Sequence, residues 1–262
     1  MVPTNRAAVL NGPHKGVTDM DQAIETLQKW VDESRRIVFF GGAGVSTESG
    51  IPDFRSQDGL YNQKYPDPPE TIVSHTYFVR RTEEFYRFYK DKMLSPWAKP
   101  NAAHKKLAEL EKAGKLTAVV TQNIDGLHQD AGSSAVYELH GSVRRNFCTR
   151  CHARYDGMDI ILDSPGVPKC PKCGGLIKPD VVLYEEGLDS DVLYGAVEKI
   201  RDADLLIVGG TSLVVYPAAG LINYYQGRRL VLINLQPTGM DSRANLVIKG
   251  KIGEVLGQIQ VR

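Results

Sequence analysis

Long apolar runs are absent from this sequence, and none approaches the roughly 18 residues that a membrane-spanning helix needs. Residues 1–17 lack the long apolar core of a secretory signal and are typical of a loose N-terminal arm. Excess charge is absent too, because 32 basic residues balance 31 acidic ones and leave a net charge of +1. Such a chain has no general attraction to nucleic acid or anionic membranes. We therefore expect a soluble protein, cytoplasmic by default, with no membrane partner.

Cysteine is scarce as well: the chain has four, arranged as two C-x-x-C pairs. Cys148 and Cys151 form the first pair, and Cys170 and Cys173 form the second after eighteen intervening residues. Two turns that each present two thiolates are typical of a tetrahedral Zn²⁺ site. Two disulfides are the alternative, although they are more usual in small secreted domains. Four protein ligands leave no coordination position for water, so we expect one structural zinc holding a ribbon at about residues 147–177.

A glycine-rich turn follows the first predicted strand. Residues 36–40 (RIVFF) form an apolar run typical of a buried strand, and GGAG (41–44) follows at once. Ser46, Thr47 and Ser49 come next and can cap or begin a helix. A strand, a glycine turn and a helix N-terminus together form a site for phosphate or pyrophosphate. The spacing differs from the common G-x-G-x-x-G fingerprint, so a turn that merely ends a strand is the alternative.

Strands and helices alternate along the chain, which is long enough for one large domain with a small insertion. The pattern predicts an α/β fold, with a doubly wound parallel Rossmann-like sheet and a smaller lobe of zinc ribbon and helices. Predicted strands cover residues 36–40, 116–120, 136–139, 178–184, 204–208, 230–234 and 246–248. We expect the Rossmann-like domain to comprise residues 18–55, 94–143 and 178–262. Residues 56–93 would supply a cofactor loop and the helical part of the small lobe, and residues 144–177 its zinc ribbon.

Polar residues follow several of these strands. TQNIDGLH (121–128) follows one strand, and a second small-residue turn, GGTS (209–212), follows another. Open α/β sheets hold their ligands at the carboxyl ends of such strands. His140 ends the strand at 136–139 and can serve as a catalytic base, although a lone histidine is more often structural.

An aromatic helix is predicted over FVRRTEEFYRFYKDKM (78–93). Helical spacing places Phe85 and Tyr89 on one face, with Tyr86 nearby. Core packing is the favoured interpretation of this cluster, and a pocket wall is the alternative.

Together these motifs resemble the sirtuin family, the NAD-dependent protein lysine deacylases, in its bacterial type. The motifs occur in the family's order: GAGVSTESGIPDFR (42–55), TQNIDGLH (121–128), YELHGS (137–142), the paired C-x-x-C motifs and GTSLVVYPAA (210–219). They cover nearly the whole chain after residue 20. The resemblance implies that NAD is a consumed co-substrate: the acyl group passes from lysine to ADP-ribose, and nicotinamide is released.

The resemblance also assigns roles to individual residues. His140 would be the catalytic base, and Asn123 a second catalytic residue at the nicotinamide end. The NAD site would comprise Gly42, Ala43, Asp53, Phe54, Arg55, Gln122, Asn123, Ile124, Asp125, His140, Gly210, Thr211, Ser212, Asn234 and Ile252. An acylated-lysine peptide would pair as an added strand and contact Tyr86, Tyr89, Val182, Tyr184, Glu185, Val214 and Val215. The zinc would take no part in the chemistry, and we expect a monomer.

Two positions depart from the family's pattern. The family commonly has Phe-Gly-Glu where this chain has YEE (184–186), so Glu185 occupies the usual glycine position. Members that remove succinyl or malonyl groups carry Tyr-x-x-Arg, whereas here Tyr86 is followed by Tyr89 at the arginine position. Without that guanidinium, a negatively charged acyl group has no bidentate partner. We therefore predict that the substrates carry acetyl or other uncharged acyl groups.

Other functions use some of the same features. A protein ADP-ribosyltransferase would share the pocket, and a catalytically silent NAD- or acyl-lysine-binding module would use it without chemistry. The presence of Asn123, Asp125 and His140 disfavours the silent module. A nucleotide oxidoreductase is weaker still, because no separate hydride-acceptor domain is visible. The ribbon is locally basic, but such charge is usually a solvated face, and aromatic residues suited to stacking on bases are few there, so nucleic acid is not an expected partner.

Overall fold

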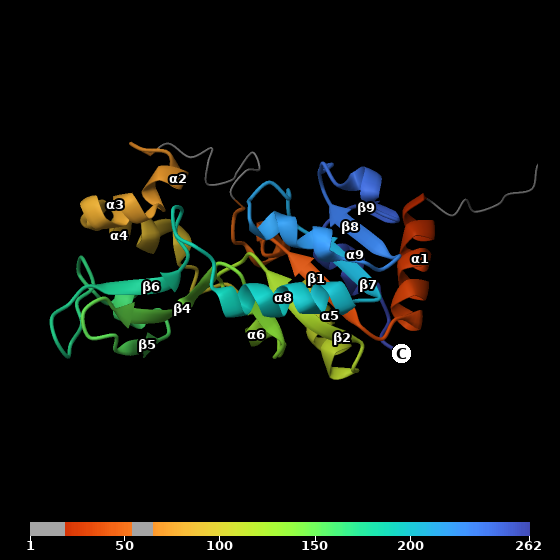
Figure 1. The fold of residues 1–262 in the computed structure, drawn as a ribbon, viewed down its shortest axis with the longest axis horizontal. Coiled ribbons are helices and arrows are strands. Elements are labelled where there is room, and N and C mark those ends of the chain that lie inside the picture. The colour runs from red at the N-terminus through yellow and green to blue at the C-terminus, as the bar shows by residue number, and fades with distance from the viewer. Residues whose placement is uncertain (1–18, 54–64) are drawn as a thin grey trace, which may run out of the picture.

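The computed structural model of the chain describes residues 19–53 and 65–262. Its larger lobe is built on a six-stranded sheet in the order β3-β2-β1-β7-β8-β9, in which every pairing is parallel (Figure 1). These strands are β1 (Ile37–Gly41), β2 (Leu116–Thr121), β3 (Val136–Glu138), β7 (Leu205–Gly209), β8 (Leu230–Asn234) and β9 (Leu246–Lys249). β1 and β7 lie at the centre, with β2 and β3 on one side and β8 and β9 on the other. This order confirms the predicted doubly wound Rossmann-like sheet.

Helical segments cover both faces of this sheet, because alternate residues of each strand point to opposite sides. Ile37 and Phe39 face a core shared with α1 (Asp19–Glu33), α5 (Ala102–Lys112) and α9 (Ile252–Gly257). Val38 and Phe40 face a second core, shared with α8 (Ser190–Asp202) and the 3-10 helix Ala218–Tyr224. Burial on both sides explains the uninterrupted apolar run of β1. No described helix has the length and apolar character to cross a membrane.

The smaller lobe lies beside the large sheet along the long axis of the molecule (Figure 1). It contains an antiparallel sheet in the order β5-β4-β6. Its elements are β4 (Gly141–Cys148), β5 (Arg154–Asp156), β6 (Ile177–Val181), α2 (Pro69–Ile72), α3 (His75–Arg80), α4 (Thr82–Phe88) and α7 (Asp159–Leu162). The strand expected at residues 178–184 is β6, and it pairs antiparallel with β4 in this small sheet instead of joining the large parallel one. The ribbon's sheet therefore extends a few residues beyond both ends of the predicted segment 144–177. The domain boundaries given above stay a prediction.

Two predicted helices take a different form. After the glycine turn the chain forms two short 3-10 helices, Ala43–Val45 and Thr47–Ser49, and the second ends at Gly50, which is in the left-handed region at φ 83°. The aromatic segment 78–93 is broken at Arg81, whose φ is −133° and ψ is 53°, and it ends in a π-helical turn, Tyr89–Met93. Next to this break the Thr82 hydroxyl donates to the Phe78 carbonyl at 2.8 Å. In a continuous α-helix that carbonyl would accept the backbone N–H of Thr82, so the side chain competes with the helical hydrogen bond.

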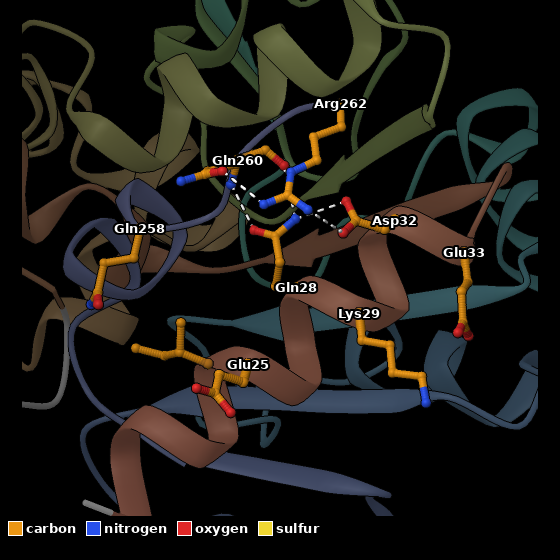
Figure 2. Close-up of a pocket in the computed structure, with 9 residues that line it drawn as sticks. Glu25, Gln28, Lys29, Asp32, Glu33, Gln258, Gln260 and Arg262 are labelled. Atoms are coloured by element: carbon orange, nitrogen blue, oxygen red, sulfur yellow. Dashed lines mark hydrogen bonds and ion pairs between the residues drawn. The ribbon is translucent and has the colours of Figure 1, made fainter. Parts of the chain in front are cut away.

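The C-terminal residues are fastened to α1 (Figure 2). The Gln28 side-chain amide pairs with the backbone of Gln260 in both directions, at 2.9 Å and 2.7 Å. Arg262 lies 3.6 Å from Asp32. The open hollow of about 430 Å³ beside them is lined by α1 and the C-terminal residues, not by the strand ends where a doubly wound sheet binds its ligand.

Two buried histidines, one in α5 and one in the short helix α6 (Leu127–Asp130), pack against each other. The rings of His104 and His128 are 4.7 Å apart, and both side chains are essentially inaccessible to water. Asn101 caps α5, and its backbone N–H donates to Nδ1 of His104 at 3.3 Å. Burial lowers the pKa of His104 to about 4 and that of His128 to about 3. Both imidazoles are therefore neutral in the folded protein near pH 7.

This pair is expected to make the fold sensitive to acid. In the unfolded chain each histidine takes up a proton below its ordinary pKa of about 6.5, whereas the folded chain holds both neutral to much lower pH. Stability is therefore full above pH 6.5 and is lost as the pH falls, by about 2 kcal/mol for each histidine at pH 5. Urea unfolding at pH 7 and pH 5 measures this loss.

His128→Phe removes one titrating ring while retaining an aromatic side chain. The variant is expected to lose about 2 kcal/mol less than the parent between pH 7 and pH 5. His152→Asn is the matched control, because His152 is exposed and its φ of 58° suits asparagine. Equal pH dependence in the parent and His128→Phe would contradict the expectation.

Candidate active site

The two glycine turns meet where the strand order reverses. Gly44 N–H donates to the Gly210 carbonyl at 2.8 Å, and Gly42 N–H donates to the Gly209 carbonyl at 3.3 Å. A Cβ on Gly44 would lie 2.8 Å from the Gly210 Cα, so the turns approach as closely as they do only because both are glycine. The carboxyl ends of β1 and β7 are the switch point at which doubly wound sheets bind nucleotides.

Polar side chains from neighbouring strand ends meet at the same switch point. Gln122 Nε2 lies 3.4 Å from the Thr211 hydroxyl, and Thr211 N–H donates to Asn234 Oδ1 at 3.0 Å. The Nδ2 of Asn234 is buried and has no hydrogen-bond partner within the described parts of the chain. A buried donor without a partner is costly, so this amide fits a site that a polar ligand completes. The glycine cradle and the orphan amide together fit a dinucleotide.

The loop after β2 is held by hydrogen bonds to the first glycine turn. The Ser46 hydroxyl donates to Asp125 Oδ2 at 2.7 Å, and Asn123 Nδ2 donates to the Ser46 oxygen at 3.0 Å. The other carboxylate oxygen of Asp125 accepts the Leu127 N–H at 2.9 Å. Asn123 and Asp125 are thus fixed beside the glycine turn although they belong to a different strand end.

His140 joins this group from the end of β3. Its Nδ1 is 2.9 Å from the Gln122 carbonyl oxygen. A carbonyl can only accept, so Nδ1 carries the proton, and Nε2 is the nitrogen that can take up another. Burial lowers the pKa of His140, and the bond to the Gln122 carbonyl opposes part of that change. The neutral imidazole needed by a general base therefore persists below the ordinary histidine pKa.

The segment after β6 passes directly behind His140. Val182 N–H donates to the His140 carbonyl at 3.0 Å, and Tyr184 forms a bridge with Ser74 of the helical part. Glu185 adopts φ 77°, a left-handed conformation that favours glycine. Its carboxylate accepts from the backbone N–H and the hydroxyl of Thr76 at 2.8 Å and 2.7 Å. These two bonds offset the backbone strain and hold the side chain against the start of α3.

The four cysteines converge at the far end of the small lobe. Their sulfur atoms all lie within 4.8 Å of one another, with Cys148 and Cys173 at 3.5 Å and Cys151 and Cys170 at 3.7 Å. A disulfide would require about 2.05 Å, whereas a tetrahedral site with Zn–S bonds of about 2.3 Å requires roughly 3.8 Å between sulfurs. The group therefore fits a four-thiolate zinc and not two disulfides.

Comparison with known proteins decides the family. The Sir2 family profile matches residues 42–217. The chain is 62% identical over 243 residues to the NAD-dependent protein deacetylase of Clostridium perfringens (strain 13 / Type A), covering 92% of this chain and 99% of that protein. This chain belongs to the Sir2 family, the sirtuins. The NAD-dependent protein deacetylase of Staphylococcus aureus (strain N315) is 46% identical over 231 residues, which are 87% of this chain and 94% of the relative.

Solved sirtuin structures share the fold. A Sir2 complex with a p53 peptide and NAD⁺ matches with a TM-score of 0.79 and 44% identity, over 89% of this chain and 95% of that one. A Sir2 complex with a deacetylated p53 peptide and 3′-O-acetyl ADP ribose matches with a TM-score of 0.82 and 42% identity, over the same shares of the two chains.

Most of the residues predicted for the NAD site of this sirtuin lie at the switch point. Gly42, Ala43 and Gly210 are in the two turns, and Ile252 is buried with its side chain against Gly209. Ser212 is exposed at the rim, and Asp53 is half-buried. Phe54 and Arg55 lie outside the described residues. Their roles, like those of the other predicted site residues, stay predictions.

The predicted substrate residues divide into two groups. Tyr184 and Val214 are 41% and 55% exposed, and Val182 and Val215 are half-buried, so these segments present surface that a peptide can contact. Tyr86 and Tyr89 are instead buried in the small-lobe core. This agrees with the core-packing interpretation of the aromatic cluster, and a contribution to the acyl pocket stays a prediction.

Sequence reasoning treated Ser46 only as a possible helix cap. The structure places its hydroxyl between Asn123 and Asp125, where it orients both. The one available signal was its place two residues after Gly44, inside a turn that was already assigned to ligand binding.

Proposed function

We propose that this sirtuin is an NAD-dependent protein lysine deacetylase. The observation that carries the proposal is the gathering of Asn123, Asp125 and the Nδ1-protonated His140 beside the glycine turns of the switch point. The relatives named above, which share 46% to 62% of their residues with it, are NAD-dependent protein deacetylases. The four-cysteine centre supplies structure rather than chemistry, because its ligands leave no open coordination position.

Different residues at the switch point suit different parts of NAD. The turn residues Gly42 and Ala43 suit its phosphates, and Gln122 suits the ribose. Asn123, Ile124 and Asp125 would surround the nicotinamide end. The adenosine half would be held by Gly210, Thr211, Ser212, Asn234 and Ile252. When bound, NAD supplies an activated ribose carbon that releases nicotinamide and accepts the acyl oxygen of the substrate.

The protein's own contribution is to orient groups and to move a proton. His140 accepts a proton at Nε2 from a ribose hydroxyl, while its Nδ1–H stays bonded to the Gln122 carbonyl. That bond fixes the ring and its tautomer, as a base needs. Asn123 and Asp125 keep fixed positions through Ser46, so the reacting groups need no reorganisation. Final transfer of the acyl group to ADP-ribose rather than to water is part of the proposal.

An acyl-lysine peptide is proposed to lie between residues 182–186 and 214–215. Both segments are partly exposed, and the first lies behind His140 through the Val182–His140 hydrogen bond. A peptide added as a strand would be recognised mainly through its main chain. The cytoplasmic location, the monomeric state and the lack of a nucleic-acid partner stay predictions.

Mass spectrometry of an acetyl-lysine peptide, incubated with and without NAD, tests the function directly. We expect NAD-dependent loss of acetyl, with acetyl-ADP-ribose formed in equal amount. Label from NAD appearing on the peptide or on the protein would indicate an ADP-ribosyltransferase instead. NAD binding without turnover would indicate a silent binding module.

The preferred acyl group follows from position 89. Tyr89 is buried and offers no positive charge, so a succinyl carboxylate would be desolvated without a partner. We expect kcat/KM for an acetyl-lysine peptide to exceed that for the succinyl peptide of the same sequence by at least about tenfold, which is 1.4 kcal/mol. Arg87→Gln serves as the control and should leave the ratio unchanged. Faster removal of succinyl than of acetyl would refute the expectation.

A further inference from the structure

One arginine of the small lobe grips the loop that carries Asn123 and Asp125. Arg144 lies in β4, four residues after His140. Its Nη1 and Nη2 donate to the two carboxylate oxygens of Asp130, each at 2.5 Å, and its Nε donates to the Asp125 carbonyl at 3.1 Å. The planar guanidinium of Arg144 thus donates three hydrogen bonds to residues 125–130 of the large domain.

The guanidinium lies directly against the backbone of this loop. Gly126, between Asp125 and α6, has φ 76°, and a Cβ there would lie 2.5 Å from Arg144 Nε. Glycine is therefore required by its conformation and by the approach of the arginine. The strand also holds the loop through its backbone, because Val143 N–H donates to the Ile124 carbonyl at 2.9 Å.

Asp125 is consequently held from two sides. On the large-domain side its carboxylate is bonded to Ser46 and Leu127. On the small-lobe side its carbonyl is bonded to Arg144. The same strand, β4, begins at Gly141, directly after the candidate base. The hydrogen bonds of Arg144 to Asp125 and Asp130, called the clamp below, thus set the position of the Asn123–Asp125 loop relative to His140.

We propose that Arg144 is a positioning residue for the reaction: it fixes the loop at the nicotinamide end of the site relative to His140, without touching substrate or NAD. The inference rests on the proposed function for its kinetic consequence. Loosening the loop lowers kcat, because the reacting groups lose alignment. Binding of ADP-ribose, which lacks nicotinamide, does not depend on the clamp and stays unchanged.

The test is a double-mutant cycle. Arg144→Gln and Asp130→Asn each remove one partner of the paired hydrogen bonds between the guanidinium and the carboxylate. Each variant is expected to lower kcat about tenfold. The double variant is expected to fall no further than Arg144→Gln alone, because that change already removes the bonds to Asp130. Arg144→Lys keeps the positive charge but lacks the planar guanidinium, so it should recover only part of the kcat that Arg144→Gln loses. Arg154→Gln, an exposed arginine of the same small sheet, is the control and should match the parent.

Two further readouts separate positioning from a merely structural role. ADP-ribose affinity, measured by calorimetry, should stay within twofold of the parent. Hydrogen exchange of the Gly126 and Leu127 amides should accelerate in Arg144→Gln and not in Arg154→Gln. A kcat within twofold of the parent, additive losses in the double variant, or unchanged exchange would each overturn the proposal. If the parent removed no acetyl group, the proposed function would fail, and the exchange experiment would still decide whether the clamp exists.

Discussion

His140→Ala is expected to reduce NAD-dependent deacetylation by about 10³-fold, within the 10²- to 10⁴-fold range of general-base catalysis. The change removes the imidazole that lies at the end of β3, with a proton-accepting nitrogen and a tautomer fixed by the Gln122 carbonyl. NAD affinity should change little, because the glycine turns and the Asn234 amide are untouched. Single-turnover deacetylation and calorimetric NAD titration measure the two effects separately.

His140→Asn is the matched variant. Its amide can still donate to the Gln122 carbonyl and so keep the local hydrogen bond, but it offers no base. Both variants should therefore be equally inactive, which separates proton transfer from local structure. In the parent, kcat should decline on the acid side only at a pH below the ordinary histidine pKa of about 6.5, because burial lowers the pKa of His140. Activity of His140→Ala within tenfold of the parent would remove His140 from the mechanism.

The larger fold could be predicted because its signals are local. Alternating apolar runs and helical periodicities placed all six strands of the large sheet to within a residue or two, and the predicted strand 230–234 matches β8 without change. The order of the strands in the sheet depends instead on pairings between distant parts of the chain. β1 lies beside β7, which is more than 160 residues further along the chain, and no local pattern encodes that pairing. Only the alternation of strands and helices made a doubly wound sheet the expected outcome.

The site was predictable where motifs carry it and not where single long-range hydrogen bonds do. Ser46 and Asp125 are 79 positions apart, and Arg144 bonds to residues 14 and 19 positions before it. Nothing in the sequence marks these pairs. Glu185 shows a second limit: the residue type does not predict a left-handed backbone, yet Glu185 adopts φ 77° while its carboxylate is bonded to Thr76.

Loss of one cysteine of the zinc centre is expected to remove both metal and activity, although the zinc takes no part in the chemistry. Among the described residues, the apolar cluster around the cysteines has just three buried members, Cys148, Cys170 and Ile177, which is too little to hold a ribbon without metal. Cys151→Ser should therefore bind less than about 0.1 zinc per chain, against one in the parent. β4 continues from the ribbon to His140, so loosening it also disturbs the active site.

Metal content by mass spectrometry, hydrogen exchange and deacetylation measure the three consequences together. Exchange should rise through residues 147–177 in Cys151→Ser and stay at parental levels in the sheet of β1, β7 and β8. Lys172→Ser, inside the second C-x-x-C pair, is the matched control, because it changes a neighbouring side chain without removing a ligand. A zinc-free parent about 4 Da lighter than its thiol form would mean two disulfides and would overturn the metal assignment. Full activity in zinc-free Cys151→Ser would show that the ribbon folds, and positions β4, without its metal.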